Sequence, residues 1–325
     1  QMSPNARGAL IALLAFAIYA THDIAIKILG ATYSPIQIVF FSVLLSFPLA
    51  TVMLMRDNTA GTLIPRHPWW MALRTVAAVA TGVSAFYAFT VLPLAQVYAI
   101  LFAAPLMITV LAIPVLGEKV RLRRWAAVLV GLIGVLVVLR PGSTDLTLGH
   151  VAALVAALGG SIASIVVRKI GADERPVVML LYPMVTNFVV MASLLPLVYV
   201  PMPIEHLGLL GVVAVFAWIA SRMIITAYQT GEAAIIAPMQ YSQIIWATAY
   251  GAFFFGESID MTTAVGAGII IVSGMYIVLR ESRAGASENT PVLRTRSRGE
   301  TGTTPRISLF MRVAGAIPPR QIFKR

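Results

Sequence analysis

The sequence predicts an all-α membrane protein with ten transmembrane helices, arranged as two inverted five-helix repeats. Of its 325 residues, 59% are hydrophobic and only 11% are charged, and the mean hydropathy is +0.87. So few charges cannot cover the surface of a water-soluble protein of this length. The chain instead contains a succession of apolar runs of about 20 residues, the length that crosses ~30 Å of hydrocarbon. The ten predicted helices span about 8–29, 34–55, 69–92, 94–116, 122–139, 147–168, 176–200, 207–229, 234–255 and 261–280.

An internal repeat predicts the arrangement of these helices. The segment Leu92–Glu118 ends in a Gly-Glu pair, and Gly231–Glu257 ends in the same pair 139 positions later. The first apolar run returns as the sixth at an offset of 141, which aligns Lys27 with Arg168. Each half therefore has five helices, and an odd number forces the second half to enter the membrane upside down. Such inverted repeats are typical of secondary transporters that rock around a central substrate path.

The repeat also predicts the domain boundaries. We expect a first repeat over 8–140, a second, inverted repeat over 147–280, and a tail over 281–325. Nine of the 24 Lys and Arg residues fall in this tail, which is rich in Arg, Thr, Ser and Pro and lacks a helical apolar period. It is predicted to be a disordered cytoplasmic segment or a remnant of cloning. Gln1, which precedes Met2, is likewise interpreted as a remnant of processing. The basic charge therefore does not predict nucleic-acid binding.

The distribution of basic residues predicts the orientation. By the positive-inside rule, we expect both termini of this multi-pass membrane protein to lie in the cytoplasm. One set of loops and helix ends carries only Arg140 and Lys27. The other set carries Arg7, Arg56, Arg66, Lys119, Arg121, Arg123, Arg124, Arg168, Lys169, Arg175 and Arg280.

The endings of the fourth and fifth predicted helices resemble those of a known family. The Pro-bearing fourth run that ends in Gly117-Glu118, the Gly-containing fifth run that ends in Leu139-Arg140, and their repetition are similar to the EamA-type branch of the drug/metabolite transporter superfamily. The resemblance covers about residues 8–280, and within this branch the chain resembles the YddG-like bacterial amino-acid exporters. It implies an inner-membrane carrier that moves amino acids, aromatic ones among them, out of the cytoplasm.

The first predicted helix carries the most informative polar residues. Tyr19, Asp23 and Lys27 are spaced at i, i+4 and i+8, and His22 precedes Asp23. One interpretation is structural: Asp23 and Lys27 form a helical ion pair near the outer leaflet. The other makes His22 or Asp23 a substrate or proton site, because ionisable groups within a membrane span are expensive unless they have a function.

The eighth predicted helix carries Arg222, which has no acidic neighbour one turn away. It either snorkels to the cytoplasmic surface or offers its guanidinium group to a substrate carboxylate. Polar and aromatic residues on the other helices predict a cavity wall that suits a zwitterion with an apolar side chain, and it would also suit a planar organic cation. The candidate substrate-binding residues are Tyr19, His22, Ser84, Tyr87, Tyr98, Ser164, Trp218, Arg222, Gln240, Gln243 and Trp246.

Prolines and glycines predict the shape of the helices. Pro105 and Pro238, in the fourth helix of each half, are expected to kink their helices as flex points for gating or as fixed bends. Gly131, Gly134, Gly266, Gly268 and Gly274 are expected to let the fifth and tenth helices approach closely. Glu118 and Glu257 stand at helix ends and are interpreted as loop or cap residues.

The inverted repeat indicates alternating access, and the family resemblance implies that the substrates are amino acids moved out of the cytoplasm. The chain has no Walker A loop to drive transport with ATP and no cysteine to hold a metal or a disulfide, and we expect no cofactor. The expected partners are a small-molecule substrate and the lipid bilayer, with the protein a monomer or weak dimer. The alternative is a proton-coupled exporter of drugs or organic cations. A remote alternative, an intramembrane hydrolase, would use Ser161 of a lone Gly159-Gly160-Ser161 with His22 as base, and we expect no enzymatic activity.

Overall fold

The computed structural model describes residues 4–57, 61–117, 119–140, 142, 145–170, 173–230 and 237–282. Every regular element in these ranges is a helix, which confirms the all-α fold class. The elements are α1 (Pro4–Gly30), α2 (Pro35–Arg56), α3 (Pro68–Val91), α4 (Leu94–Leu101), α5 (Ala104–Leu116), α6 (Leu122–Leu139), α7 (Leu148–Ile170), α8 (Pro176–Val198), α9 (Ile204–Thr230), the 3₁₀ helix η1 (Ala237–Ser242), α11 (Gln243–Phe255) and α12 (Met261–Ser282).

Eight segments in the described part of the chain are long and apolar enough to cross a membrane, with α4 and α5 counted together, and Met261–Ile277 is a shorter apolar helix. The ninth predicted run, 234–255, is described only from Ala237 onward, as η1 and α11. The count of ten transmembrane helices therefore stays a prediction. The predicted tail lies outside the described residues, apart from the last two residues of α12.

Prolines and glycines set several helix boundaries. Proline occupies the first turn of α2, α3, α5 and α8, where its missing N–H group costs no hydrogen bond. Gly117 ends α5 with φ 67°, and Gly256 ends α11 with φ 62°. This left-handed conformation is open to glycine without a steric penalty. The two predicted Gly-Glu endings thus share one backbone geometry at their glycines, while Glu118 lies outside the described residues.

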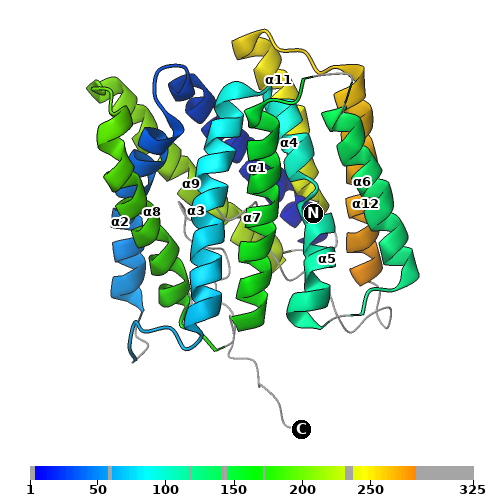
Figure 1. Cartoon of the computed structure of the whole chain (residues 1–325), viewed down its shortest axis with the longest axis horizontal. Helices are drawn as coiled ribbons and strands as arrows, with labels where there is room; N and C mark the ends of the chain where they lie inside the picture. The colour runs from blue at the N-terminus through cyan, green and yellow to red at the C-terminus, as the bar shows by residue number, and fades with distance from the viewer. Residues whose placement is uncertain are drawn as a thin grey trace.

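Four helix pairs dominate the packing. α1 lies along α9, α3 along α7, α6 along α12 and α2 along α8 (Figure 1). Under the predicted repeat, α1 corresponds to α7 and α3 to α9, so the first two pairs are equivalent to each other. α6 and α12 approach closely where both have glycine. A Cβ atom on Gly266 would lie only 2.8 Å from the carbonyl oxygen of Gly134, so only glycine fits there. Gly268 was expected at the same interface, but a Cβ atom there would have no atom of the described residues within 4 Å.

The fourth apolar run is interrupted rather than bent. α4 ends at Leu101 and α5 begins at Ala104, with Pro105 in the first turn of α5. The expectation of a kink at Pro105 inside a continuous helix is therefore wrong in form, because the chain starts a new helix at the proline. Pro238 is the second residue of η1, which precedes α11, so the described part of the corresponding run starts as a 3₁₀ helix before it becomes α-helical. Phe102, at the first interruption, contacts Tyr241 of η1 with ring centroids 5.1 Å apart.

Candidate substrate site

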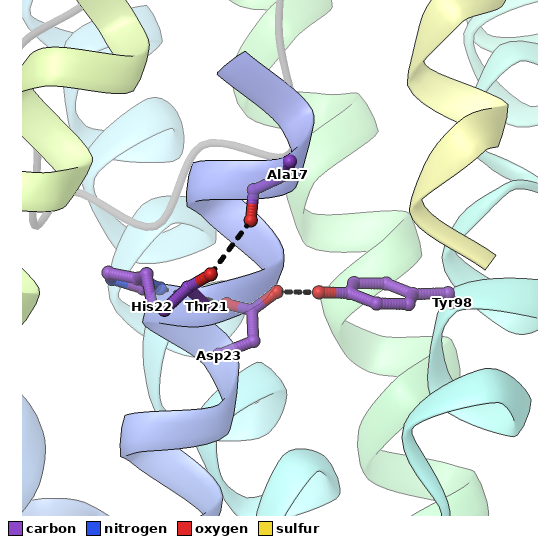
Figure 2. Close-up of polar contacts among 5 residues, drawn as sticks. All are labelled: Ala17, Thr21, His22, Asp23 and Tyr98. Atoms are coloured by element: carbon purple, nitrogen blue, oxygen red, sulfur yellow. Dashed lines mark hydrogen bonds and ion pairs between the residues drawn. The ribbon is translucent and has the colours of Figure 1, made fainter. Parts of the chain in front are cut away.

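The candidate site centres on Asp23, in the second half of α1, whose exposed fraction is 0%. The hydroxyl group of Tyr98, on α4, donates a hydrogen bond to Oδ2 of Asp23 (Figure 2). Nδ1 of His22 lies 2.8 Å from Oδ1 of the same carboxylate. His22 and Tyr98 are buried as well. The structure thus brings together three of the residues that the sequence singles out, from two helices.

A buried carboxylate requires partners. Moving a charged group from water into a protein interior costs several kcal/mol even after the surroundings relax. This cost is comparable to the whole free energy of unfolding of a folded domain. Hydrogen bonds from a phenol and an imidazole offset part of this cost, and both donors can rotate away. The arrangement can therefore hold either a negative carboxylate or a carboxylate neutralised by a proton or by a cationic ligand.

Lys27 does not have the predicted role. Its Nζ atom lies 2.5 Å from Oε1 of Glu257 and donates to the carbonyl oxygen of Leu92 at 2.7 Å. The expected helical ion pair between Asp23 and Lys27 is therefore wrong: Asp23 faces α4, whereas the longer lysine side chain reaches the segment that follows α11. Glu257, interpreted from the sequence as a loop or cap residue, belongs to this polar cluster. The repetition of the Gly-Glu pair was the signal that could have indicated it.

Two further hydrogen bonds connect α1 to the surrounding helices. The hydroxyl group of Tyr19 lies 2.7 Å from Oγ of Ser221 on α9. The hydroxyl group of Thr21, which also donates to the carbonyl oxygen of Ala17, lies 3.2 Å from that of Tyr250 on α11. α1 is thus joined to α4, α9 and α11 within two helical turns around Asp23.

Aromatic rings surround the Tyr98 side of the site. The ring centroid of Tyr98 lies 5.7 Å from that of Phe89 in an edge-to-face contact and 6.4 Å from that of Phe102 in a stacked one. On the other side of Asp23, the rings of Tyr19 and His22 are 6.5 Å apart at 85°. Such faces accept apolar side chains and, through their quadrupoles, cations.

Gln243 is a further buried polar candidate. It begins α11, its exposed fraction is 4%, and its Nε2 atom has no hydrogen-bond partner in the part of the chain that the structure describes. A buried amide hydrogen without a partner costs about 1–3 kcal/mol, so a ligand that accepts from it gains that much. α1 packs against both η1 and α11, which places Gln243 on an element that borders the site.

The remaining candidates lie on α3, α7, α9, η1 and α11. Arg222 is exposed, with its guanidinium carbon 5.7 Å from the ring centroid of Trp218. Ser164 is buried on α7, and the other side chains are half-buried. These half-buried residues are Ser84, Tyr87, Trp218, Gln240 and Trp246. Among the described residues, no group of three or more His, Cys, Asp and Glu side chains could hold a metal ion.

The known proteins that this chain resembles are membrane transporters. The sequence pattern of the EamA-like transporter family matches residues 6–140 and again 147–279. An S-adenosylmethionine uptake transporter of Rickettsia prowazekii is 25% identical over 279 residues, 85% of this chain and 94% of that protein. The pseudopaline exporter CntI of Pseudomonas aeruginosa is 27% identical over 286 residues, 86% and 97% of the two chains. A solved crystal structure with 17% identity aligns at a TM-score of 0.59, covering 86% of this chain and 99% of that one, and supports the fold alone.

Proposed function

The chain belongs to the EamA-like transporter family, and we propose that it moves amino acids, neutral and aromatic ones among them, out of the cytoplasm by alternating access. The observation that carries the proposal is the buried carboxylate of Asp23, held by Tyr98 and His22 among aromatic rings. The chain is a membrane transporter of small molecules and not an enzyme. Its placement in a bacterial inner membrane with both termini in the cytoplasm is part of the proposal.

An amino acid matches the chemistry of this site. Its ammonium group would replace the Tyr98 hydroxyl group as the donor to Asp23, forming a charge-assisted hydrogen bond that is stronger than one between neutral groups. An aromatic side chain would pack against Tyr98, Phe102 and Phe89. Its carboxylate would accept hydrogen bonds from the amide group of Gln243, whose Nε2 atom has no hydrogen-bond partner among the described residues, and from the exposed guanidinium group of Arg222.

One relative is named for a substrate that shares a chemical group with the proposed ones. S-adenosylmethionine, named for the Rickettsia protein, is itself a derivative of an amino acid and carries an ammonium group. Relatives are named both for uptake and for export, so the direction of transport has to be measured in both senses.

Ser161, the nucleophile of the hydrolase alternative, donates its hydroxyl hydrogen to the carbonyl oxygen of Ala157 at 2.7 Å, a structural role inside α7.

A counterflow experiment tests the proposal. Proteoliposomes are loaded with unlabelled phenylalanine, labelled phenylalanine is added outside, and the accumulation of label is followed with and without a pH gradient. Accumulation that depends on the protein supports amino-acid transport. Cells preloaded with labelled phenylalanine then report the direction, because faster loss of label than from cells that make the Asp23→Asn variant indicates export. Absence of phenylalanine counterflow would refute the proposed substrate.

A second candidate function is proton-coupled export of organic cations. It is favoured by the contact between His22 and Asp23, two adjacent titratable groups that a proton or a cation could occupy in turn. Methyl viologen, an organic dication, replaces phenylalanine in the same proteoliposomes. Movement of methyl viologen that follows the pH gradient, in the absence of phenylalanine counterflow, would establish this function instead.

A further inference from the structure

Two segments, one after α3 and one at the end of α11, converge on Lys27, near the end of α1. Its Nζ atom lies 2.5 Å from Oε1 of Glu257, donates to the carbonyl oxygen of Leu92 at 2.7 Å, and lies 5.1 Å from the ring centroid of Phe255. The side chains of Lys27 and Glu257 are only 10% and 21% exposed. Water screens so enclosed an ion pair weakly, and breaking it would leave a charge without its partner.

The chain builds a specific turn to present Glu257. Gly256 adopts the left-handed conformation, and the N–H group of Glu257 folds back to donate to the carbonyl oxygen of Gly251 at 2.9 Å. A Cβ atom on Gly251 would lie 2.9 Å from Oε2 of Glu257, so glycine is needed there to make room for the carboxylate. This Oε2 atom accepts a hydrogen bond from the N–H group of Leu94, the first residue of α4, at 3.3 Å.

The ion pair and the candidate site share the same two helices. Lys27 lies one helical turn after Asp23 on α1, and Leu94 lies one turn before Tyr98 on α4. α1 and α4 are therefore joined at two levels, by Tyr98 and Asp23 at one and by Lys27, Glu257 and Leu94 at the other. Because α4 has only eight residues and ends at the interruption before α5, it can move as one short rigid unit.

We propose that Lys27 and Glu257 form the gate that closes the substrate path at the end where α1 terminates, and that Glu257 is a positioning residue that holds Tyr98 on Asp23 through α4. The inference rests on the proposed function, since a gate requires a path that opens to one side at a time. When an ammonium group binds Asp23, it displaces the Tyr98 hydroxyl group. α4 then loses one of its two connections to α1, so that the gate opens more readily. In the predicted orientation this end faces the periplasm.

A second ion pair at this end of the protein provides a matched control. Nη1 of Arg140 lies 2.9 Å from Oδ2 of Asp260, which joins the end of α6 to the start of α12. Burial opposes the ionisation of Asp260, but hydrogen bonds from Thr263 and the charge of Arg140 outweigh it and lower the pKa of Asp260. The pair is thus charged at neutral pH, but it is more exposed, with 28% and 45% for the two side chains. It connects helices that do not carry Asp23 or Tyr98.

The gate can be tested without any substrate. The chain contains no cysteine, so Thr21→Cys introduces a single thiol at the site, nearly two turns from Lys27 on α1. A membrane-impermeant methanethiosulfonate reagent is added to intact cells and, separately, to inverted membranes. We expect Glu257→Gln to speed labelling of this thiol about tenfold from one side only, the change that corresponds to ~1.4 kcal/mol. Asp260→Asn should change it less than about twofold, because exposed pairs contribute little.

A charge exchange separates a gate from a folding defect. In the Thr21→Cys background, Lys27→Glu alone should label as fast as Glu257→Gln, and adding Glu257→Lys should restore slow labelling by re-forming the attraction. Unchanged labelling in Glu257→Gln from both sides, an equal increase in Asp260→Asn, or no recovery in the exchanged pair would overturn the gate. Labelling rates are independent of what is transported, so the gate and the amino-acid proposal can fail separately.

The positioning role needs its own measurement. Glu257→Gln, Tyr98→Phe and the double variant are compared by the KM for phenylalanine counterflow. If Glu257 acts through Tyr98, the effect of Glu257→Gln should disappear in the Tyr98→Phe background, whereas an independent structural role gives additive changes. Glu257→Asp, which keeps the carboxylate, should recover at least part of the wild-type KM. Additive effects would assign Glu257 to the gate alone and overturn its positioning role.

Discussion

Tyr98 donates its hydroxyl hydrogen to Asp23 from a helix of only eight residues, so the contact joins the centre of α1 to a short, separate element (Figure 2). This matters because α4 ends three residues after Tyr98, where the apolar run breaks before α5. In inverted-repeat transporters, interrupted helices commonly supply the substrate site, since irregular backbone is tolerated only beside protein or a water-filled path. The position of Asp23 next to such a break is the basis for the predictions below.

Asp23→Asn should abolish the transport of ammonium-bearing substrates. The amide is nearly the same size but carries no charge, so the ammonium group of phenylalanine loses its partner in a buried site. We expect phenylalanine counterflow to fall at least about 30-fold, corresponding to ~2 kcal/mol. Any dependence of transport on a pH gradient should disappear with it. Asp145→Asn, which changes an exposed carboxyl group before α7, is the matched control. Counterflow at the wild-type rate in Asp23→Asn would remove Asp23 from the site.

The hydrogen bond between Tyr19 and Ser221 should contribute measurably to the pairing of α1 with α9. Its two oxygens lie 2.7 Å apart, and both residues are buried. A double-mutant cycle with Tyr19→Phe and Ser221→Ala should give a coupling free energy of about 0.6 kcal/mol, the average for such bonds between membrane helices. Thermal unfolding in detergent supplies the stabilities. Strictly additive effects would show that the two hydroxyl groups do not stabilise each other.

The sequence predicted the helices better than their interruptions. The predicted run 122–139 coincides with α6, and 69–92 differs from α3 by one residue at each end. In contrast, the break at Phe102 was not predicted, because Pro105 is compatible with both a bend and a new helix. The pairing of Lys27 with Glu257 was missed for a related reason. Helical spacing indicates partners one turn away, whereas this partner comes from a distant segment that only the fold brings near.

Candidate residues for the site were predicted from polarity within apolar runs, and the same signal has a clear limit. It found Tyr19, His22, Asp23 and Tyr98, which the structure places in contact through a short series of bonds and ring contacts. It could not order Ser84, Tyr87 or Ser164 relative to them, because polarity does not state which face of a helix meets which neighbour. Their roles in binding remain predictions.

Two glycines on α12 should respond in opposite ways to alanine. At Gly266 a Cβ atom would lie 2.8 Å from the carbonyl oxygen of Gly134 and 2.9 Å from the amide nitrogen of Val138, and backbone cannot move aside cheaply. Gly266→Ala should therefore destabilise the pairing of α6 with α12 by about 1–3 kcal/mol. A Cβ atom at Gly268 would have no atom of the described residues within 4 Å, so Gly268→Ala should be neutral or stabilise the helix by roughly 0.5–1 kcal/mol. Thermal unfolding of the two variants compares them directly, and equal loss in both would contradict the packing.

Arg222→Ala should distinguish substrates that carry a carboxylate from those that do not. The guanidinium group lies over Trp218 and is exposed, so a substrate carboxylate could reach it in a two-pronged contact. We expect Arg222→Ala to raise the KM for phenylalanine about tenfold, corresponding to ~1.4 kcal/mol, and to leave phenethylamine, which lacks the carboxylate, nearly unchanged. Arg222→Lys keeps the charge but not the planar guanidinium group, so its KM for phenylalanine should lie between those of the wild type and Arg222→Ala. An equal loss for both substrates would mean that Arg222 supports the fold of α9, and unchanged transport of phenylalanine would exclude it from the site.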